Sequence, residues 1–206
     1  MDISVVVTCY NEEVYIETCI RSLINQSFDG KYEIIIVDDC SNDSTQLILG
    51  RYLNDDKIQV ITNDSNLGIG SSANIGIRKA KGRFVVRVDA DDFVSKYFLQ
   101  TLFLAVHETV FDIAIVDYSV VDNYGKTIAN HMSSLEHPIA AGVMILKELL
   151  IEFGLYSEIR INEEINLNKI ISDSGEYTHI QIPLYRYRRH KLNTSFSSNG
   201  RNLNIC

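Results

Sequence analysis

Three carboxylates within four positions form the stretch of the chain best suited to chemistry. Asp89, Asp91 and Asp92 follow the largely apolar run 84–88 and precede Phe93. Side chains two positions apart on extended backbone face the same way, so Asp89 and Asp91 can converge on one object. Converging carboxylates repel one another unless a cation lies between them. Such hard oxygen ligands favour Mg²⁺ or Mn²⁺.

A purely structural interpretation of the same stretch stays open. In that interpretation it is an acidic turn in which Asp92 or Ser95 caps the following helix. Asp92 points away from Asp89 and Asp91 on an extended chain, so we expect it to be the cap in either case.

Two other predicted strands, at residues 3–8 and 34–37, also lead into polar residues. Ligands of open parallel sheets bind outside the carboxyl ends of the strands. At that edge Asp39 or Asp89 can accept hydrogen bonds from uracil N–H or ribose hydroxyl groups. Tyr10 offers a flat face on which a ring can stack.

The elements that must position these residues follow from the hydrophobic pattern. Short, β-branched, nearly all-apolar runs predict strands buried on both faces, and apolar residues three or four positions apart predict helices. The expected strands are 3–8, 34–37, 58–61 and 84–88, and the expected helices are 12–26, a segment carrying Leu47, Ile48 and Leu53, a segment ending near Lys81, and 96–107. Four strand–helix repeats predict an α/β fold with a largely parallel sheet and right-handed crossovers.

Polar residues at the ends of these elements are given local structural roles. Asn11 is the expected N-cap of the first helix, and Glu12 suits the positive end of the helix dipole. Asp38 is interpreted as a turn former. Asn74 is expected to brace a loop instead of binding a ligand.

The second half of the chain has a less regular pattern. A turn at 123–126 lies between two segments of strand-like sequence and predicts a hairpin. The expected elements are strands at 112–122, 127–130 and 180–187, helices at 145–153 and 163–171, and an irregular segment at 131–142.

Composition limits the class of protein. The chain has 206 residues, compatible with one domain, and its net charge of −8 argues against general nucleic-acid binding, which needs a basic surface. The four cysteines form no CxxC pair, so we expect reduced thiols and a cytoplasmic location. The N-terminus is unlike a signal peptide, and no apolar run approaches the roughly 20 residues of a membrane helix.

Several short motifs follow one another along most of the chain. They are Thr8-x-Tyr10-Asn11-Glu12, Val37-Asp38-Asp39-x-Ser41-x-Asp43-x-Thr45, Asn66-x-Gly68 with Asn74-x-Gly76-Ile77, Asp89-x-Asp91-Asp92, Lys147-Glu148-Leu149-Leu150 with Phe153-Gly154, Glu163-Glu164-x-x-Leu167, and Pro183-Leu184-Tyr185-Arg186-Tyr187-Arg188-x-His190. In this combination and order they resemble the family 2 glycosyltransferases of GT-A fold. The resemblance covers about residues 3–195.

The resemblance implies a GT-A fold: a Rossmann-like, mostly parallel central sheet flanked by helices, with a smaller mixed C-terminal acceptor region. Residues 1–110 would form the nucleotide-sugar-binding half of a single domain, and residues 111–206 the acceptor-binding half. The residues that would bind the nucleotide-sugar donor are Thr8, Tyr10, Glu12, Asp39, Gly68 and Asp89.

The resemblance also implies the reaction. Asp91 would coordinate the Mg²⁺ or Mn²⁺ ion that bridges the donor diphosphate, and Glu164 would be the base that deprotonates the acceptor hydroxyl. Transfer would invert the anomeric centre in one displacement. The family carries aspartate where Glu164 stands, and glutamate is one methylene longer, so the choice between Glu163 and Glu164 stays open.

The expected partners are a UDP-sugar donor and a saccharide or lipid-linked saccharide acceptor, used in surface polysaccharide or glycolipid synthesis at the cytoplasmic face of a membrane. The basic run 186–191 is either a solvated face or a contact for the diphosphate or an anionic, lipid-linked acceptor. His190, within this run, is a candidate for a metal or phosphate contact.

Two rival interpretations remain. Gly68-x-Gly70-x-x-Ala73 fits a dinucleotide fingerprint, which would make the protein a nicotinamide-dependent oxidoreductase. That fingerprint should begin where a strand ends, yet the polar segment 62–67 intervenes, and Asp91 would have no role. The second rival is a binding module that keeps the donor site and lacks transfer activity.

Overall fold

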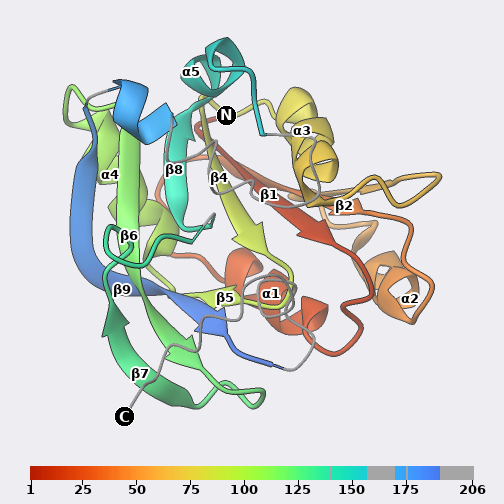
Figure 1. The fold of residues 1–206 in the computed structure, drawn as a ribbon. Helices are drawn as coiled ribbons and strands as arrows, with labels where there is room; N and C mark the ends of the chain where they lie inside the picture. Colours follow the sequence, from red (N-terminus) through yellow and green to blue (C-terminus); the bar gives the residue numbers. More distant parts are fainter. Residues whose placement is uncertain (140, 157–169, 175, 191–206) are drawn as a thin grey trace.

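The computed structural model describes residues 1–139, 141–156, 170–174 and 176–190. Their strands form one curved, nine-stranded sheet with helices on both faces (Figure 1). The strands are β1 (Ile3–Cys9), β2 (Tyr32–Asp38), β3 (Ile58–Thr62), β4 (Phe84–Asp89), β5 (Phe93–Val94), β6 (Ile113–Val121), β7 (Thr127–Met132), β8 (Val143–Leu146) and β9 (Thr178–Arg188). The helices are α1 (Ile16–Ile24), α2 (Thr45–Leu49), the 3₁₀ turn η1 (Gly50–Tyr52), α3 (Ile69–Lys79), α4 (Phe98–His107) and α5 (Lys147–Glu152).

The sheet joins a parallel half to a mixed half. Its order is β3-β2-β1-β4-β8-β6-β9-β5, with β7 paired to β6. Strands β3, β2, β1 and β4 run parallel, whereas β8 is antiparallel to both β4 and β6. The α/β class and the parallel first half are therefore confirmed, and the hairpin expected around the turn at 123–126 is the β6–β7 pair.

Both faces of the parallel strands are buried, which is why their sequences are almost entirely apolar. Every residue of β1 and β2 is buried. Helices α1 and α4 cover one face through residues such as Ile20 and Leu102, and α3 covers the other through Ala73 and Ile77 (Figure 1). The helices thereby hold the sheet in position, and the carboxyl ends of its strands remain available to form a site.

The prediction that Asn11 caps the first helix is wrong. Helix α1 begins at Ile16, and its N-cap residue, Tyr15, makes no side-chain capping bond. Asn11 has a φ of 58°, and its Oδ1 accepts a hydrogen bond from Asn42 N at 2.8 Å. The loop after β1 is therefore held by the loop after β2, and this long-range contact replaces a local cap.

The helix expected at 145–153 begins later than predicted. Residues Val143–Leu146 form β8, and only Lys147–Glu152 are helical. Periodicity cannot distinguish a short apolar strand from the start of a buried helix. Here the segment becomes a strand because it fills the position between β4 and β6 and pairs with both.

Part of the second expected helix lies outside the described residues. Residues 170–174 are helical, and 163–169, which include Glu163 and Glu164, are not described. Across the described part of the chain, no helix has the length and apolar character needed to cross a bilayer.

Candidate functional site

The carboxyl ends of β1, β2 and β4 meet at one edge of the sheet. β1 lies between β2 and β4, and its Thr8 is in register with Val37 on one side and Asp89 on the other. Asp39, just after β2, donates its backbone N–H to Cys9 O at 2.8 Å. The prediction that polar residues from three separate strands lie together at one edge of the sheet is therefore confirmed.

Glu12 lies in a strongly negative environment at this edge. Its pKa is raised to about 8, and burial is the largest cause. The negative charges of Asp91, Asp43 and Asp89 add to this rise. Arg188 opposes it. These acids would be stabilised by a cation placed between them.

Arg87 supplies a positive charge that sequence reasoning missed. It is buried within β4, and its Nη2 donates to Asp89 Oδ1 at 3.0 Å. Burial raises the pKa of Asp89, and the charge of Arg87 opposes that rise. An arginine in the middle of an otherwise apolar strand was the available signal, because a buried arginine needs an anionic partner.

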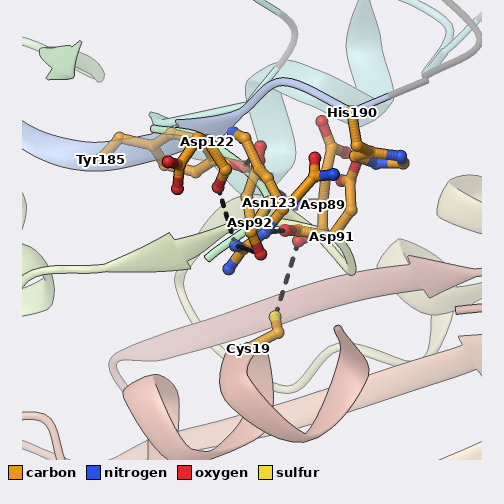
Figure 2. A network of polar contacts seen from close by, with 9 residues as sticks. Cys19, Asp89, Asp91, Asp92, Asp122, Asn123, Tyr185 and His190 are labelled. Carbon is orange, nitrogen blue, oxygen red and sulfur yellow. Dashed lines mark hydrogen bonds and ion pairs between the residues drawn. The ribbon is translucent and has the colours of Figure 1, made fainter. Parts of the chain in front are cut away.

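His190 meets Asp91 although 99 positions separate them. His190 Nε2 lies 2.9 Å from Asp91 Oδ2 (Figure 2). The centroid of the His190 ring lies 4.8 Å from that of the Tyr15 ring. The end of the basic run therefore reaches the acidic site, so the interpretation of this run as a solvated face is wrong at His190. Imidazole nitrogen and carboxylate oxygen are both ligands for divalent metals.

The expectation that Asp92 or Ser95 caps the next helix is wrong. The N-cap residue of α4 is Tyr97, which makes no side-chain capping bond. Asp92 instead accepts the O–H of Tyr185 at 2.7 Å and the N–H of Arg188 at 2.6 Å (Figure 2). Burial, followed by the charges of Asp91 and Asp89, raises the pKa of Asp92 well above its usual range. Asp92 is thus a structural acid that ties β4 to β9.

Asp39 and Gly68, both predicted to bind the donor, are hydrogen-bonded to each other. Asp39 Oδ2 accepts the N–H of Gly68 at 2.8 Å, and its Oδ1 accepts Leu67 N and Asn63 Nδ2, each at 2.8 Å. Gly68 has a φ of 90°, a conformation that favours glycine. Asp39 therefore fixes the loop before α3, and both residues lie at the sheet edge where a ligand would bind.

Thr8 and Tyr10 present groups that a ligand could use. Thr8 is only 7% exposed, and among the described residues its Oγ1 has no hydrogen-bond partner. A buried hydroxyl without a partner is costly, so a bound molecule that pairs with it would gain affinity. Tyr10 is 44% exposed at the same edge.

The turn-forming role assigned to Asp38 is confirmed, whereas Asn74 braces a different segment from the glycine loop expected. Asp38 Oδ1 accepts the N–H of Ser41 at 3.2 Å and forms the turn after β2. Asn74 Nδ2 donates to Tyr156 O, and Asn74 Oδ1 accepts Tyr156 N, each at 2.9 Å. Asn74 thereby braces the segment after α5 against α3.

The oxidoreductase interpretation is not supported at Gly68. The N–H of Gly68, which a dinucleotide fingerprint would aim at a pyrophosphate, donates to Asp39. The residues between the end of β3 and Gly68 form a loop, as the sequence indicated.

The donor set fits an ion shared between protein and ligand. Within the described ranges, no cluster of three or more His, Cys, Asp or Glu is arranged to hold a metal ion by itself. Asp91 and His190 offer one oxygen and one nitrogen ligand. Mg²⁺ is commonly held by one or two carboxylates plus substrate phosphates and water, so a partial protein ligand set is the expected form.

Comparison with known proteins supplies a family. A family model described as "Glycosyl transferase family 2" matches residues 4–193. Glycosyltransferase GlyG of Streptococcus pneumoniae serotype 4 is 33% identical, covering 91% of this chain and 70% of GlyG. The putative glycosyltransferase EpsH of Bacillus subtilis is 30% identical, covering 95% of this chain and 57% of EpsH.

Solved structures give the same fold. The crystal structure of Staphylococcus aureus TarS 1–349 in complex with UDP-GlcNAc has a TM-score of 0.83 and 23% identity, covering 97% of this chain and 62% of that chain. TarS is a poly(ribitol-phosphate) beta-N-acetylglucosaminyltransferase, and in sequence the match covers 22% of it at 34% identity. The present chain thus corresponds to only part of several relatives, and the expected GT-A fold is confirmed.

Proposed function

The chain belongs to glycosyl transferase family 2, and we propose that it moves a sugar from a nucleoside-diphosphate donor to an acceptor hydroxyl with inversion. The observation that carries this proposal is the acidic edge at the ends of β1, β2 and β4, where His190 meets Asp91. An edge rich in carboxylates repels a diphosphate unless a divalent cation joins the two, so metal dependence belongs to the proposal.

The proposed donor is a UDP-sugar. A structural relative supports this choice, since TarS has been solved in complex with UDP and with UDP-GlcNAc. The donor-binding residues proposed for this chain are Thr8, Tyr10, Glu12, Asp39, Gly68 and Asp89. The buried hydroxyl of Thr8 and the exposed ring of Tyr10 offer a hydrogen bond and a stacking face for the nucleoside.

The proposed cofactor is Mg²⁺ or Mn²⁺, held by Asp91 with His190 beside it. A bound divalent ion would stabilise the negative charge that develops on the departing nucleoside diphosphate. The carboxylate of Asp89 would reach the ribose or the ion. The hydrogen bond from Arg87 would hold this carboxylate in its orientation.

The proposed acceptor is a saccharide or lipid-linked saccharide of a surface polysaccharide, bound by the half formed by residues 111–206. Relatives such as the minor teichoic acid biosynthesis protein GgaB of Bacillus subtilis support this class of pathway. We place the reaction in the cytoplasm, with peripheral contact to an anionic membrane. Two basic members of the run 186–191, Arg188 and His190, face the acidic site, so the proposed membrane contact is assigned to the other three, Arg186, Arg189 and Lys191.

The proposed catalytic base is Glu164, which lies outside the described residues together with Glu163. A base abstracts the proton of the acceptor hydroxyl during attack, so Glu164→Gln should reduce UDP release from UDP-sugar and acceptor by about 10²-fold or more. Binding of UDP with Mn²⁺ should be unchanged, because the base does not hold the nucleotide.

Glu163→Gln is the matched control, since it makes the same change one residue away. Normal turnover in Glu164→Gln with lost turnover in Glu163→Gln would move the base to Glu163. Undiminished turnover in both variants would remove this pair from the mechanism. If the wild-type chain binds UDP and Mn²⁺ but forms no UDP from UDP-sugar and acceptor, the non-catalytic binding module is favoured.

A further inference from the structure

The residues Asp89 to Asp92, here called the acid turn, are held from the far end of the chain. Tyr185, in β9, accepts the N–H of Asp89 at 3.1 Å and donates its O–H to Asp92 at 2.7 Å. Tyr185 is fully buried, so these contacts are shielded from water. One phenol therefore joins both ends of the acid turn (Figure 2).

Arg188, three residues further along β9, holds the middle of the acid turn. Its N–H donates to Asp92 Oδ1 at 2.6 Å, and its Nε donates to the carbonyl oxygen of Asp91 at 2.7 Å. Arg188 is only 3% exposed, although it lies in a basic run. Its guanidinium thus fixes the main chain of Asp91, whose side chain meets His190 from the same segment.

The same guanidinium also reaches the β6–β7 hairpin. Arg188 Nη1 donates to the carbonyl oxygens of Asp122 and Asn123, at 3.1 and 2.8 Å (Figure 2). Its carbon Cζ lies 4.7 Å from the ring centroid of Tyr15 and 5.4 Å from that of Phe93. A planar fork with fixed donors can satisfy carbonyls on two sides at once, which a lysine ammonium cannot reproduce.

We propose that Arg188 and Tyr185 are positioning residues for the metal–diphosphate site: they set the backbone of Asp91 so that its carboxylate can share an ion with the donor. This inference rests on the proposed function. Groups that orient a metal ligand affect metal affinity when they are changed, even though they never touch the ion. The positive charge of Arg188 also opposes the raised pKa of Glu12 at the same edge of the sheet.

The substitution Arg188→Lys keeps the positive charge and removes the planar arrangement of donors, so it tests whether the hydrogen-bond geometry of Arg188 matters. We expect the apparent Kd for Mn²⁺, titrated in the presence of UDP and read by calorimetry, to rise on the order of tenfold. Excess Mn²⁺ should restore UDP binding, and turnover should recover with it. The matched control is Arg186→Lys, on the same strand. Within the described part of the chain, the Arg186 guanidinium donates only to carbonyls of its own strand, those of Pro183 and Tyr185.

Tyr185→Phe is the second variant, used also if Arg188→Lys fails to fold. It removes one O–H and keeps the ring, and we expect a rise in the Mn²⁺ Kd of several-fold. A role confined to stability would lower the melting temperature of either variant and leave the Mn²⁺ Kd of the folded protein unchanged. That result, or an equal rise in Arg186→Lys, would overturn the inference. If wild-type protein fails to bind UDP and Mn²⁺, the proposed function fails instead.

Discussion

Glu12 illustrates how the site works at the scale of a single residue. Its backbone N–H donates to Thr45 Oγ1 at 2.8 Å, which holds the residue at the sheet edge. Burial, together with the neighbouring acids, raises the pKa of its carboxyl group to about 8. A group that resists ionisation near neutral pH is well placed to respond when a cation arrives, since the cation favours its charged form.

The raised pKa of Glu12 predicts a pH dependence of stability. Its folded-state pKa of about 8 lies above its usual value of 4.5, so between these values the folded chain binds a proton that the unfolded chain has lost. The free energy of unfolding should therefore fall as pH rises through this window. Glu12→Gln removes the titrating group, so its unfolding free energy should fall less steeply with pH.

Urea unfolding of both proteins between about pH 5 and pH 8, with EDTA to remove metal ions, measures this slope. Below the window, at about pH 3, the wild-type carboxyl is neutral in both states and the slopes should converge. Parallel pH profiles of wild type and variant through the whole window would contradict the assigned environment of Glu12.

At the same scale, the sequence revealed the acids of the site and pointed to the basic run 186–191, but it missed Arg87 and the partners of Arg188. Asp39, Asp89 and Asp91 could be placed at one edge because the carboxyl ends of parallel strands lie together. Arg87 and Arg188 act through partners that depend on how distant strands pair, which local spacing does not encode.

At the scale of elements, strands were predicted better than helix starts. Strands β1 and β2 are buried on both faces, and a continuous β-branched run is a direct consequence of that burial. Asn11 and Asp92 both have the chemistry of a cap, yet each bonds a residue from another element. Capping patterns assume local partners, so they fail where a polar residue serves a site built from several loops.

The close approach of α3 to the sheet gives an element-scale prediction. A Cβ at Gly76 would lie 2.6 Å from Val6 Cγ1 and 3.3 Å from Val37 Cγ2, both side chains of the buried core. Gly76→Ala should therefore lower the free energy of unfolding by about 1–3 kcal/mol, because an overpacked core must shift. Urea unfolding measures the change.

Gly50→Ala is the matched control for Gly76→Ala. A Cβ at Gly50 meets nothing within 4 Å, and its backbone is right-handed helical, with φ −54° and ψ −26°. The same substitution there should leave stability unchanged or raise it by about 0.5–1 kcal/mol. Equal effects at the two glycines would contradict the tight packing of α3 on β1 and β2.

At the scale of the whole molecule, the proposed donor and acceptor halves are interleaved. The parallel strands of the first half carry the acids, but β9, from the second half, contacts both β6 and β5 and ends beside the acid turn. A donor site completed by the last described strand cannot form from residues 1–110 alone. We therefore expect the two halves to fold and bind as one unit.

The account's central claim is that this acidic edge binds a nucleoside diphosphate together with a divalent metal ion. Thermal unfolding with UDP, GDP or CDP, each with and without Mn²⁺ or Mg²⁺, tests it most directly. A ligand at about 100 times its Kd stabilises the folded state by about 2.7 kcal/mol. That corresponds to a rise of several degrees in the melting temperature for a chain of this size.

We predict that UDP with metal raises the melting temperature, that UDP without metal gives little change, and that Asp91→Asn abolishes the metal-dependent part. Gln59→Glu is a suitable control, since Gln59 is exposed on β3 and is not one of the proposed site residues. Absence of metal-dependent stabilisation by all three nucleotides would contradict the claim.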